Sequence, residues 1–338
     1  SARRCSASPT GRVDRGRWSF RVHYCAHAMI PGVVQRHVVA GDGTRIGYQV
    51  RGEGPCVVLA NGLGGTYITF RSLYEALGGG YKTISWDYRG LYTSAAPADP
   101  QANTIAHQVD DLMAILAAEQ VGDVVIAGWS MGVQVALEAV KRHPSRVRGL
   151  FAINGTYGRA FHTVLGSRLV GQIIPMLLRL VRAQAGLVGR ATKRVAGSDA
   201  LIGAMKRVGL VSETVDLEVF RAVAAGFQQV DWVIYSDLLG RLDEHDAEDV
   251  LARIEVPLTV VTGDRDLMTP PATAEHIHRA VPGSRLVVIR GGTHYTPVEY
   301  PAIVVDELGK LLDRVPGWAR RAQGAAGGDA RARRGGPA

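Results

Sequence analysis

Short apolar runs alternate with amphipathic stretches along the middle of the chain. Apolar residues spaced three and four apart predict helices at 67–77, 104–119, 132–143, 271–280 and 297–314. The short apolar runs predict strands at 46–50, 56–60, 82–86, 123–127, 147–153, 256–262 and 285–289. Strands that alternate with helices are typical of an α/β protein, with a mostly parallel central sheet and helices on both faces. Functional residues are therefore expected in the loops beyond the carboxyl ends of the strands.

One long interval breaks this alternation. Between Gly155 and about Arg253 the sequence contains helical stretches, such as "RLVGQIIPMLLRLVRAQAGLVGR", and no convincing strand. Helices inserted between two strands of a sheet predict a cap over its carboxyl edge. We therefore expect residues 29–154 and 254–314 to form the core, and residues 155–253 to form a helical cap or lid.

The basic charge of the chain lies at its ends. The net charge is +8, of which residues 1–28 contribute +5 and residues 315–338 contribute +4, so the rest is near neutral. This distribution argues against a nucleic-acid footprint on a folded face. The first segment has no signal-peptide h-region and the last is rich in Gly, Ala and Arg, so we expect both to be disordered. We interpret residues 1–28 as an extension translated from upstream of the start, with an Arg-rich targeting arm as the alternative.

Cysteine content and hydropathy indicate the compartment. Three cysteines, two of them within residues 1–28, do not make a disulfide framework and favour a reducing environment. No apolar run reaches the roughly 18 residues that a membrane-spanning helix needs. We expect a cytoplasmic protein, with peripheral membrane contact as a further option that depends on the cap.

The pentad Gly128-Trp129-Ser130-Met131-Gly132 lies between a strand pattern, "VVIAG", and a helix pattern, "VQVALEAVKRH". A serine on such a sharp turn has little room beside it, which explains the two flanking glycines. The turn lifts the hydroxyl above the sheet and points the Met131 N–H toward a developing oxyanion. The pattern predicts Ser130 as a nucleophile; an ordinary glycine-bounded turn is the alternative.

A serine nucleophile needs a base, and the base needs a carboxylate that fixes its tautomer. The segment "TGDRDLMTP" follows a predicted strand and offers Asp264 and Asp266. The segment "GGTHYTPVEYP" follows the last predicted strand and offers His294. Both segments therefore lie where the partners of Ser130 are expected.

Other histidines are less suited to this chemistry, and no metal or cofactor site is predicted. His276 and His278 lie two positions apart on a predicted helix, so they do not share a face, which argues against a metal pair. His245 lies in the acidic run "DEHDAED", which we interpret as a solvated helix start.

Residues 33–314 resemble the α/β-hydrolase fold family through these motifs and the order Ser130, Asp, His294. The family usually has its acid three residues after the strand-ending glycine, which implies Asp266 and leaves Asp264 to brace the loop or to be solvated. The resemblance also implies an oxyanion hole formed by the backbone N–H groups of Met131 and of Leu63 in "NGLGG". This chain has Asn61-Gly62 where the family more often has His-Gly.

Several residues near these motifs have more than one interpretation. Asp87 and Arg89 in "SWDYRGLYTS" resemble an Asp-x-Arg-Gly segment of the family, and we expect them to brace neighbouring loops. Trp129 and Asn61 are candidate residues of the substrate pocket. For Trp129, packing beneath the cap is an equal alternative.

A serine at the elbow implies acyl transfer to water, because the dehalogenases and epoxide hydrolases of this fold use an aspartate there. An esterase, lipase, thioesterase or amidase fits this implication. A carbon–carbon bond hydrolase and a cofactor-free haloperoxidase share the triad and are alternatives. The non-enzyme alternative is a ligand-binding receptor or scaffold, whose usual mark is a lost triad member.

The predicted cap indicates the class of substrate and partner. Residues 159–198 carry seven Lys or Arg and no Asp or Glu, interleaved with aliphatic residues. We expect a small-molecule ester or thioester with an apolar acyl chain. The cations either contact a membrane surface or an anionic acyl carrier, or are simply solvated. The sequence does not indicate an oligomeric state.

Overall fold

Eight strands form one sheet in the order β1-β2-β4-β3-β5-β6-β7-β8. A computed structural model of the chain describes residues 30–163 and 168–318. The first two pairs, β1 with β2 and β2 with β4, are antiparallel, and all the other pairs are parallel. The strands are β1 (Val34–Val39), β2 (Arg45–Arg51), β3 (Cys56–Ala60), β4 (Lys82–Trp86), β5 (Val124–Trp129), β6 (Val147–Ile153), β7 (Leu258–Gly263) and β8 (Arg285–Ile289).

Helices cover both faces of this sheet, as the sequence predicts. Outside residues 155–253 they are η2 (Tyr67–Phe70), α1 (Arg71–Leu77), α2 (Ile105–Ala118), α3 (Met131–Arg142), η3 (Pro144–Arg146), α11 (Pro271–Ala280), α12 (Thr296–Glu299) and α13 (Pro301–Asp313). Alternate residues of β3 pack into opposite layers: Val58 joins a core with α2 and α3, and Leu59 joins a core with α1 and α13. The predicted α/β class is confirmed.

Two predicted helices are interrupted. The segment 67–77 begins as the 3-10 helix η2 and continues as α1. The segment 297–314 is divided between Glu299 and Pro301 into α12 and α13, because Pro301 has no N–H with which to continue a helix.

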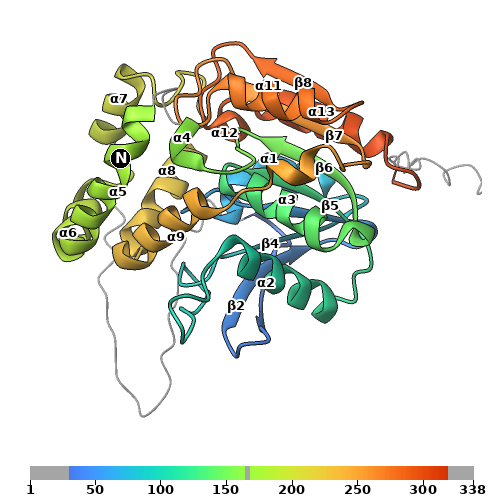
Figure 1. The fold of residues 1–338 in the computed structure, drawn as a ribbon, viewed down its shortest axis with the longest axis horizontal. Coiled ribbons are helices and arrows are strands. Elements are labelled where there is room, and N and C mark those ends of the chain that lie inside the picture. Colours follow the sequence, from blue (N-terminus) through green and yellow to red (C-terminus); the bar gives the residue numbers. More distant parts are fainter. Residues whose placement is uncertain (1–29, 164–167, 319–338) are drawn as a thin grey trace, which may run out of the picture.

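The described part of 155–253 contains helices and no strand of the sheet. They are α4 (Ala160–Thr163), α5 (Arg168–Ala183), α6 (Ala185–Val195), α7 (Asp199–Arg207), α8 (Leu217–Gly226), η5 (Phe227–Gln229), α9 (Trp232–Glu244) and α10 (Glu248–Leu251). Its two ends meet, because Arg159 N–H donates to the His245 carbonyl at 2.9 Å and Ala247 N–H donates to the Tyr157 carbonyl at 3.0 Å. The segment thus leaves and re-enters the core at one place, and Figure 1 shows α5 to α9 gathered on one side of the molecule.

The folded chain extends past Arg314. Val315 and Trp318, which we expected at the start of a disordered tail, are 2% and 8% exposed. Tyr81 stacks on the ring of Trp318 and donates its hydroxyl proton to the Trp318 carbonyl at 2.6 Å. The rest of that tail and residues 1–28 lie outside the described residues. Among the described helices, none combines the length and apolar character needed to cross a bilayer.

Candidate active site

Ser130 occupies the turn between β5 and α3 in a backbone conformation that is rare outside glycine. Its φ and ψ angles are 56° and −117°, and its N–H donates to the carbonyl of Ile153 at 3.0 Å. A Cβ at Gly128 would lie 2.3 Å from the carbonyl oxygen of Gly132. A Cβ at Gly132 would lie 2.0 Å from the carbonyl oxygen of Ala60. The two glycines of the pentad are therefore required by close backbone approach, as expected for a nucleophile elbow.

The structure brings Ser130, His294 and Asp266 together. Nε2 of His294 lies 2.9 Å from Oγ of Ser130, and Nδ1 of His294 lies 2.9 Å from Oδ2 of Asp266. Both ring nitrogens thus have a partner, and the side chains of His294 and Asp266 are buried. This arrangement holds the imidazole as a proton acceptor toward the serine hydroxyl.

Four further hydrogen bonds hold the Asp266 carboxylate. Oδ2 accepts from the Asn154 amide and the Thr269 hydroxyl, each at 2.8 Å. Oδ1 accepts from the backbone N–H groups of Met268 at 2.8 Å and Thr269 at 2.9 Å. Burial by itself would raise the pKa of Asp266, but the proximity of His294 and these hydrogen bonds outweigh it and lower the pKa.

Asn154 and Thr269 were missed by sequence reasoning. Asn154 directly follows β6 at the carboxyl edge of the sheet and adopts a positive φ of 43°, which Asn tolerates better than most residues. Its position after a strand end was the only available signal. Thr269 lies in the quoted acid loop and showed no pattern of its own.

The Asp264 carboxylate, unlike that of Asp266, contacts the beginning of the loop after β8. It accepts the N–H of Gly291 at 2.7 Å and so connects the loops after β7 and β8. Asp264 is also exposed, so the structure combines the two alternatives that the sequence left open, a brace between loops and a solvated carboxylate.

The loop after β3 lies beside the nucleophile. A Cβ at Gly62 would lie 3.1 Å from Cβ of Ser130. Among the described residues, neither the Leu63 N–H nor the Met131 N–H donates to a backbone carbonyl of a turn or loop. Asn61, a candidate pocket residue, is 1% exposed and instead donates its amide to Oγ of Ser85 at 2.9 Å. The Tyr88 hydroxyl donates to the Asn61 carbonyl at 2.6 Å, so these contacts brace the loop.

Trp129 packs between the elbow and the histidine loop. Its indole N–H donates to the backbone carbonyl of His294 at 2.8 Å. Its ring centroid lies 5.7 Å from the rings of both His294 and Tyr295, and the residue is 4% exposed. Trp129 thus contacts the histidine loop directly, a role that neither interpretation of its sequence position included.

Glu299 connects the histidine loop to the inserted helices. Its buried carboxylate accepts the N–H of Ser212 at 2.7 Å, the N–H of Thr293 at 2.8 Å and the hydroxyl of Thr293 at 2.6 Å. Thr293 immediately precedes His294, so the Glu299 carboxylate holds both the histidine loop and the segment before α8. This residue was also missed from sequence.

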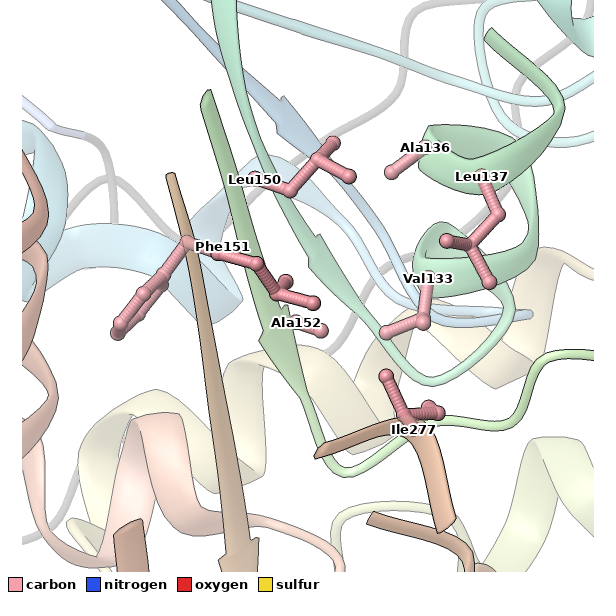
Figure 2. Close-up of a pocket in the computed structure, with 8 residues that line it drawn as sticks. Val133, Ala136, Leu137, Leu150, Phe151, Ala152 and Ile277 are labelled. Atoms are coloured by element: carbon pink, nitrogen blue, oxygen red, sulfur yellow. The ribbon is translucent and has the colours of Figure 1, made fainter. Parts of the chain in front are cut away.

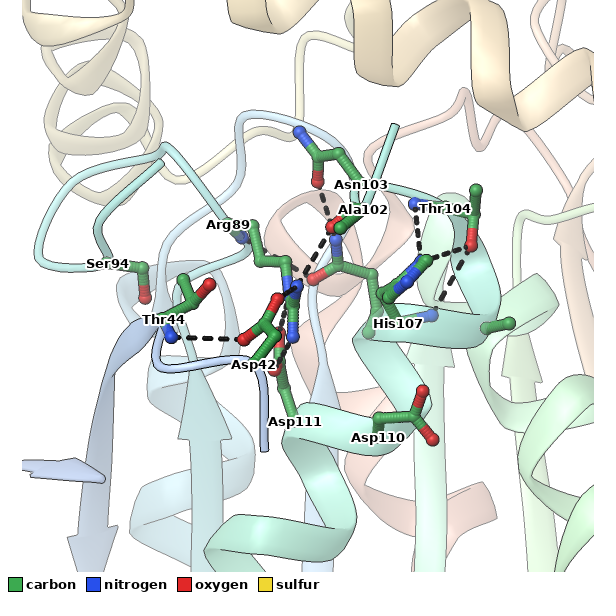
Figure 3. A network of polar contacts seen from close by, with 12 residues as sticks. Asp42, Thr44, Arg89, Ser94, Ala102, Asn103, Thr104, His107, Asp110 and Asp111 are labelled. Carbon is green, nitrogen blue, oxygen red and sulfur yellow. Dashed lines mark hydrogen bonds and ion pairs between the residues drawn. The ribbon is translucent and has the colours of Figure 1, made fainter. Parts of the chain in front are cut away.

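The segment after β4 braces loops as predicted. Arg89 is 1% exposed, and its guanidinium pairs with Asp111 at 2.6 Å and with Asp42 at 2.5 Å (Figure 3). Asp87 accepts hydrogen bonds from Thr93 and Gln49. Burial raises the pKa of Asp87 to about 6, although these hydrogen bonds favour its ionised form.

Aromatic side chains from the inserted helices lie over the site. A Cβ at Gly64 in the loop after β3 would lie 2.6 Å from the Phe227 ring and 3.0 Å from the Tyr235 ring. Phe220 of α8 packs edge-on against Tyr295, with ring centroids 5.1 Å apart. The inserted helices thus place mainly aromatic side chains beside the loops of the site.

The acidic run around His245 is exposed at Glu244, Asp246, Glu248 and Asp249 and leads into α10, as expected, but the His245 side chain itself is largely covered. Its side chain is 9% exposed, and Nε2 lies 3.1 Å from the carboxylate of Glu138 on α3. The backbone bridge between Gly158 and Asp246 draws this segment against the core, which explains the burial. Among the described residues, no cluster of metal-ligating side chains occurs.

A small cavity lies between α3 and the sheet, away from the polar site. Figure 2 shows its apolar lining. The lining residues are Val133, Ala136, Leu137, Leu150, Phe151, Ala152, Leu258 and Ile277. Because no polar side chain points into it, this cavity belongs to core packing.

Comparisons with known proteins agree with the fold and the motifs. The sequence model of the alpha/beta hydrolase family matches residues 57–307. An uncharacterised protein of Mycobacterium tuberculosis is 24% identical over 281 residues, covering 80% of this chain and 79% of that protein. A pimeloyl-[acyl-carrier protein] methyl ester esterase of Neisseria meningitidis is 30% identical over 170 residues, covering 50% of this chain and 61% of that protein.

Solved structures share the fold. A hydrolase from Pseudomonas aeruginosa superposes with a TM-score of 0.66 at 22% identity, covering 82% of this chain and 98% of that one. The chain therefore belongs to the alpha/beta hydrolase family and is an enzyme of that family.

Proposed function

We propose that this protein is a serine hydrolase that cleaves an ester or thioester of an apolar acyl substrate. Ser130 is the nucleophile, His294 the general base, and Asp266 the carboxylate that orients His294. The observation that carries the proposal is the unbroken line of polar contacts from Ser130 Oγ through the imidazole to Asp266. A serine hydroxyl becomes an effective nucleophile when a base at this distance removes its proton during attack.

The proposed reaction has two acyl-transfer steps. Ser130 Oγ attacks the substrate carbonyl while Nε2 of His294 takes the hydroxyl proton. The resulting oxyanion accepts hydrogen bonds from the N–H groups of Leu63 and Met131. The leaving alcohol or thiol departs with the proton from His294, and an acyl-enzyme remains. Water then attacks this ester with His294 again as base, which releases the acid and restores Ser130.

Two observations support an apolar acyl substrate. Phe227 and Tyr235 lie against Gly64 in the loop after β3, and Phe220 packs on Tyr295 beside His294, so this side of the site favours apolar groups. One relative is named for cleaving a methyl ester of an acyl group held on a carrier protein. In this proposal residues 155–253 act as the cap that shapes the acyl site.

A fluorophosphonate probe tests the nucleophile. Labelling of the wild-type protein is expected, with the adduct on the peptide that contains Ser130, and Ser130→Ala should abolish it. Ser72→Ala on α1 is the matched control and should keep full labelling. Wild-type protein that is not labelled, or Ser130→Ala protein that is, would refute the proposal.

A panel of esters with increasing acyl length tests the substrate class. We expect kcat/KM to rise with acyl length, because each added methylene buries more apolar surface against the aromatic side chains. Cleavage of a ring-derived dienoate without any ester hydrolysis would favour the carbon–carbon hydrolase. Halide oxidation with peroxide and an organic acid would favour the haloperoxidase.

A further inference from the structure

Helix α5 presents a row of large apolar side chains to solvent. Ile173, Met176, Leu177 and Leu180, here called the α5 stripe, are between 48% and 59% exposed. Their spacing of three and four residues places them on one face of the helix. Contiguous exposed apolar surface of this kind marks an interaction site.

A second apolar row already serves the packing of α5 on the protein. Ile174, Leu178 and Val181 are half-buried and follow the same helical spacing, displaced around the axis from the α5 stripe. The helix packs against α9. A surface helix needs only one apolar face to pack on the body of a protein. The α5 stripe is therefore not required for that packing.

Basic side chains accompany the α5 stripe. Residues 159–198 contain seven Lys or Arg and no Asp or Glu, and two of the seven, Arg159 and Arg182, pair with Asp246 and Asp237. Arg190, Lys193 and Arg194 on the neighbouring α6 are exposed, and Figure 1 shows α5 and α6 together at the edge of the molecule. The surface is therefore apolar and cationic at once.

We propose that the α5 stripe and the basic residues of α6 dock the protein on the surface of an anionic lipid bilayer. In this arrangement α5 lies in the plane of the interface, with the α5 stripe among the acyl chains near the headgroups. The cations of α6 lie near the lipid phosphates, where each contributes roughly fivefold in affinity.

Charge selects the bilayer over other occupants. A second copy of the chain would bring an equally basic surface against the first. Residues 1–28 and 315–338 carry net charges of +5 and +4, so both terminal segments have the same sign as this surface. An acidic carrier protein would pair with the cations but would leave four aliphatic side chains without apolar contacts. A bilayer that contains anionic lipid satisfies both kinds of group.

The docked orientation has a consequence for the active site. Helix α5 packs on α9, and Tyr235 of α9 lies against Gly64 in the loop after β3. Docking would therefore bring the aromatic side of the site close to the bilayer. Delivery of a membrane-dissolved acyl ester by this route rests on the proposed function, whereas the docking itself does not.

Vesicle co-sedimentation of the full chain tests the docking. Vesicles of phosphatidylcholine alone are compared with vesicles of phosphatidylcholine and phosphatidylglycerol in equal amounts. We expect binding to the mixed vesicles only, weakening as salt is added. Met176→Ser/Leu180→Ser should lower the affinity at least about tenfold. Val39→Ser/Val288→Ser, which alters exposed apolar residues of β1 and β8, is the matched control and should bind as wild type.

Three results would overturn the docking proposal. These are equal sedimentation with both kinds of vesicle, equal binding by the two double variants, and a dimer in light scattering that Met176→Ser/Leu180→Ser dissociates. Fluorophosphonate labelling in the absence of vesicles should be unchanged in both double variants. Vesicle binding without any labelling would refute the proposed function alone.

Discussion

The indole N–H of Trp129 donates a hydrogen bond to the backbone carbonyl of His294 at 2.8 Å. The residue before the proposed nucleophile therefore holds the backbone of the residue proposed as its base. The loops after β5 and β8 are linked by this bond in addition to the contact between Ser130 and His294. The separation of the two side chains thus depends on a group that takes no part in proton transfer.

Trp129→Phe tests this positioning role. Phenylalanine keeps most of the ring packing but leaves the His294 carbonyl buried without its donor, at a cost of about 1–3 kcal/mol. We expect kcat for an ester to fall about tenfold with KM little changed. Trp318→Phe, far from the site, is the control. Equal kinetic losses in the two variants would contradict the role.

Asp266→Asn should cost far more activity than Asp264→Asn. Of these two carboxylates, that of Asp266 contacts His294 Nδ1, so an amide there favours the wrong tautomer, with a loss on the order of 10⁴-fold in kcat. The Asp264 carboxylate instead accepts the Gly291 N–H and holds the loops after β7 and β8 together. Steady-state kinetics of both variants on one ester measures the two losses. Similar losses in kcat would contradict the assignment of Asp266 as the acid.

Asp87 should make stability depend on pH. Burial raises the pKa of Asp87 to about 6, above the ordinary value of about 4. The folded state therefore binds this proton more tightly, and the free energy of unfolding falls as pH rises from about 4 to about 6, by up to about 3 kcal/mol. Urea unfolding across this range should show Asp87→Asn gaining stability relative to wild type as pH rises. A difference that does not vary with pH would contradict the assignment.

Glu299→Gln should loosen the connection between the histidine loop and the inserted helices. The amide replaces one acceptor oxygen with a donor that faces the N–H of Ser212 or the N–H of Thr293. A loss of about 1–3 kcal/mol is expected, measured as a Tm lowered by about 2–4 °C for each kcal/mol. Glu275→Gln, on the exposed face of α11, should leave Tm within about a degree. An unchanged Tm in Glu299→Gln would show that these hydrogen bonds add little.

The elements of the fold were predictable because burial leaves a periodic trace in the sequence. β5, α3 and the pentad between them are local in the chain, and their hydrophobic pattern is sufficient to define them. The roles of Trp129, Asn154 and Glu299 were not predictable in the same way. Asn154 and Asp266 are 112 positions apart, and a hydrogen bond across that separation imposes no local pattern.

The solvent exposure of the α5 stripe was not predictable from the sequence, for a related reason. Its sequence shows apolar residues on more than one face, as a helix buried on several sides also would. Only the position of α9 shows that Ile174, Leu178 and Val181 point inward and that Met176 and Leu180 do not.

The strained backbone at Ser130 is held by residues that the ribosome adds later. Its N–H is bound by Ile153 at the end of β6, and Gly155 packs so closely that a Cβ there would lie 2.7 Å from the Ser130 carbonyl oxygen. A nascent chain that ends before β6 lacks both of these contacts, and His294 emerges about 140 residues later still. In the proposed mechanism Ser130 needs His294 as its base, so a nascent chain that has not reached His294 exposes no activated serine to the cell.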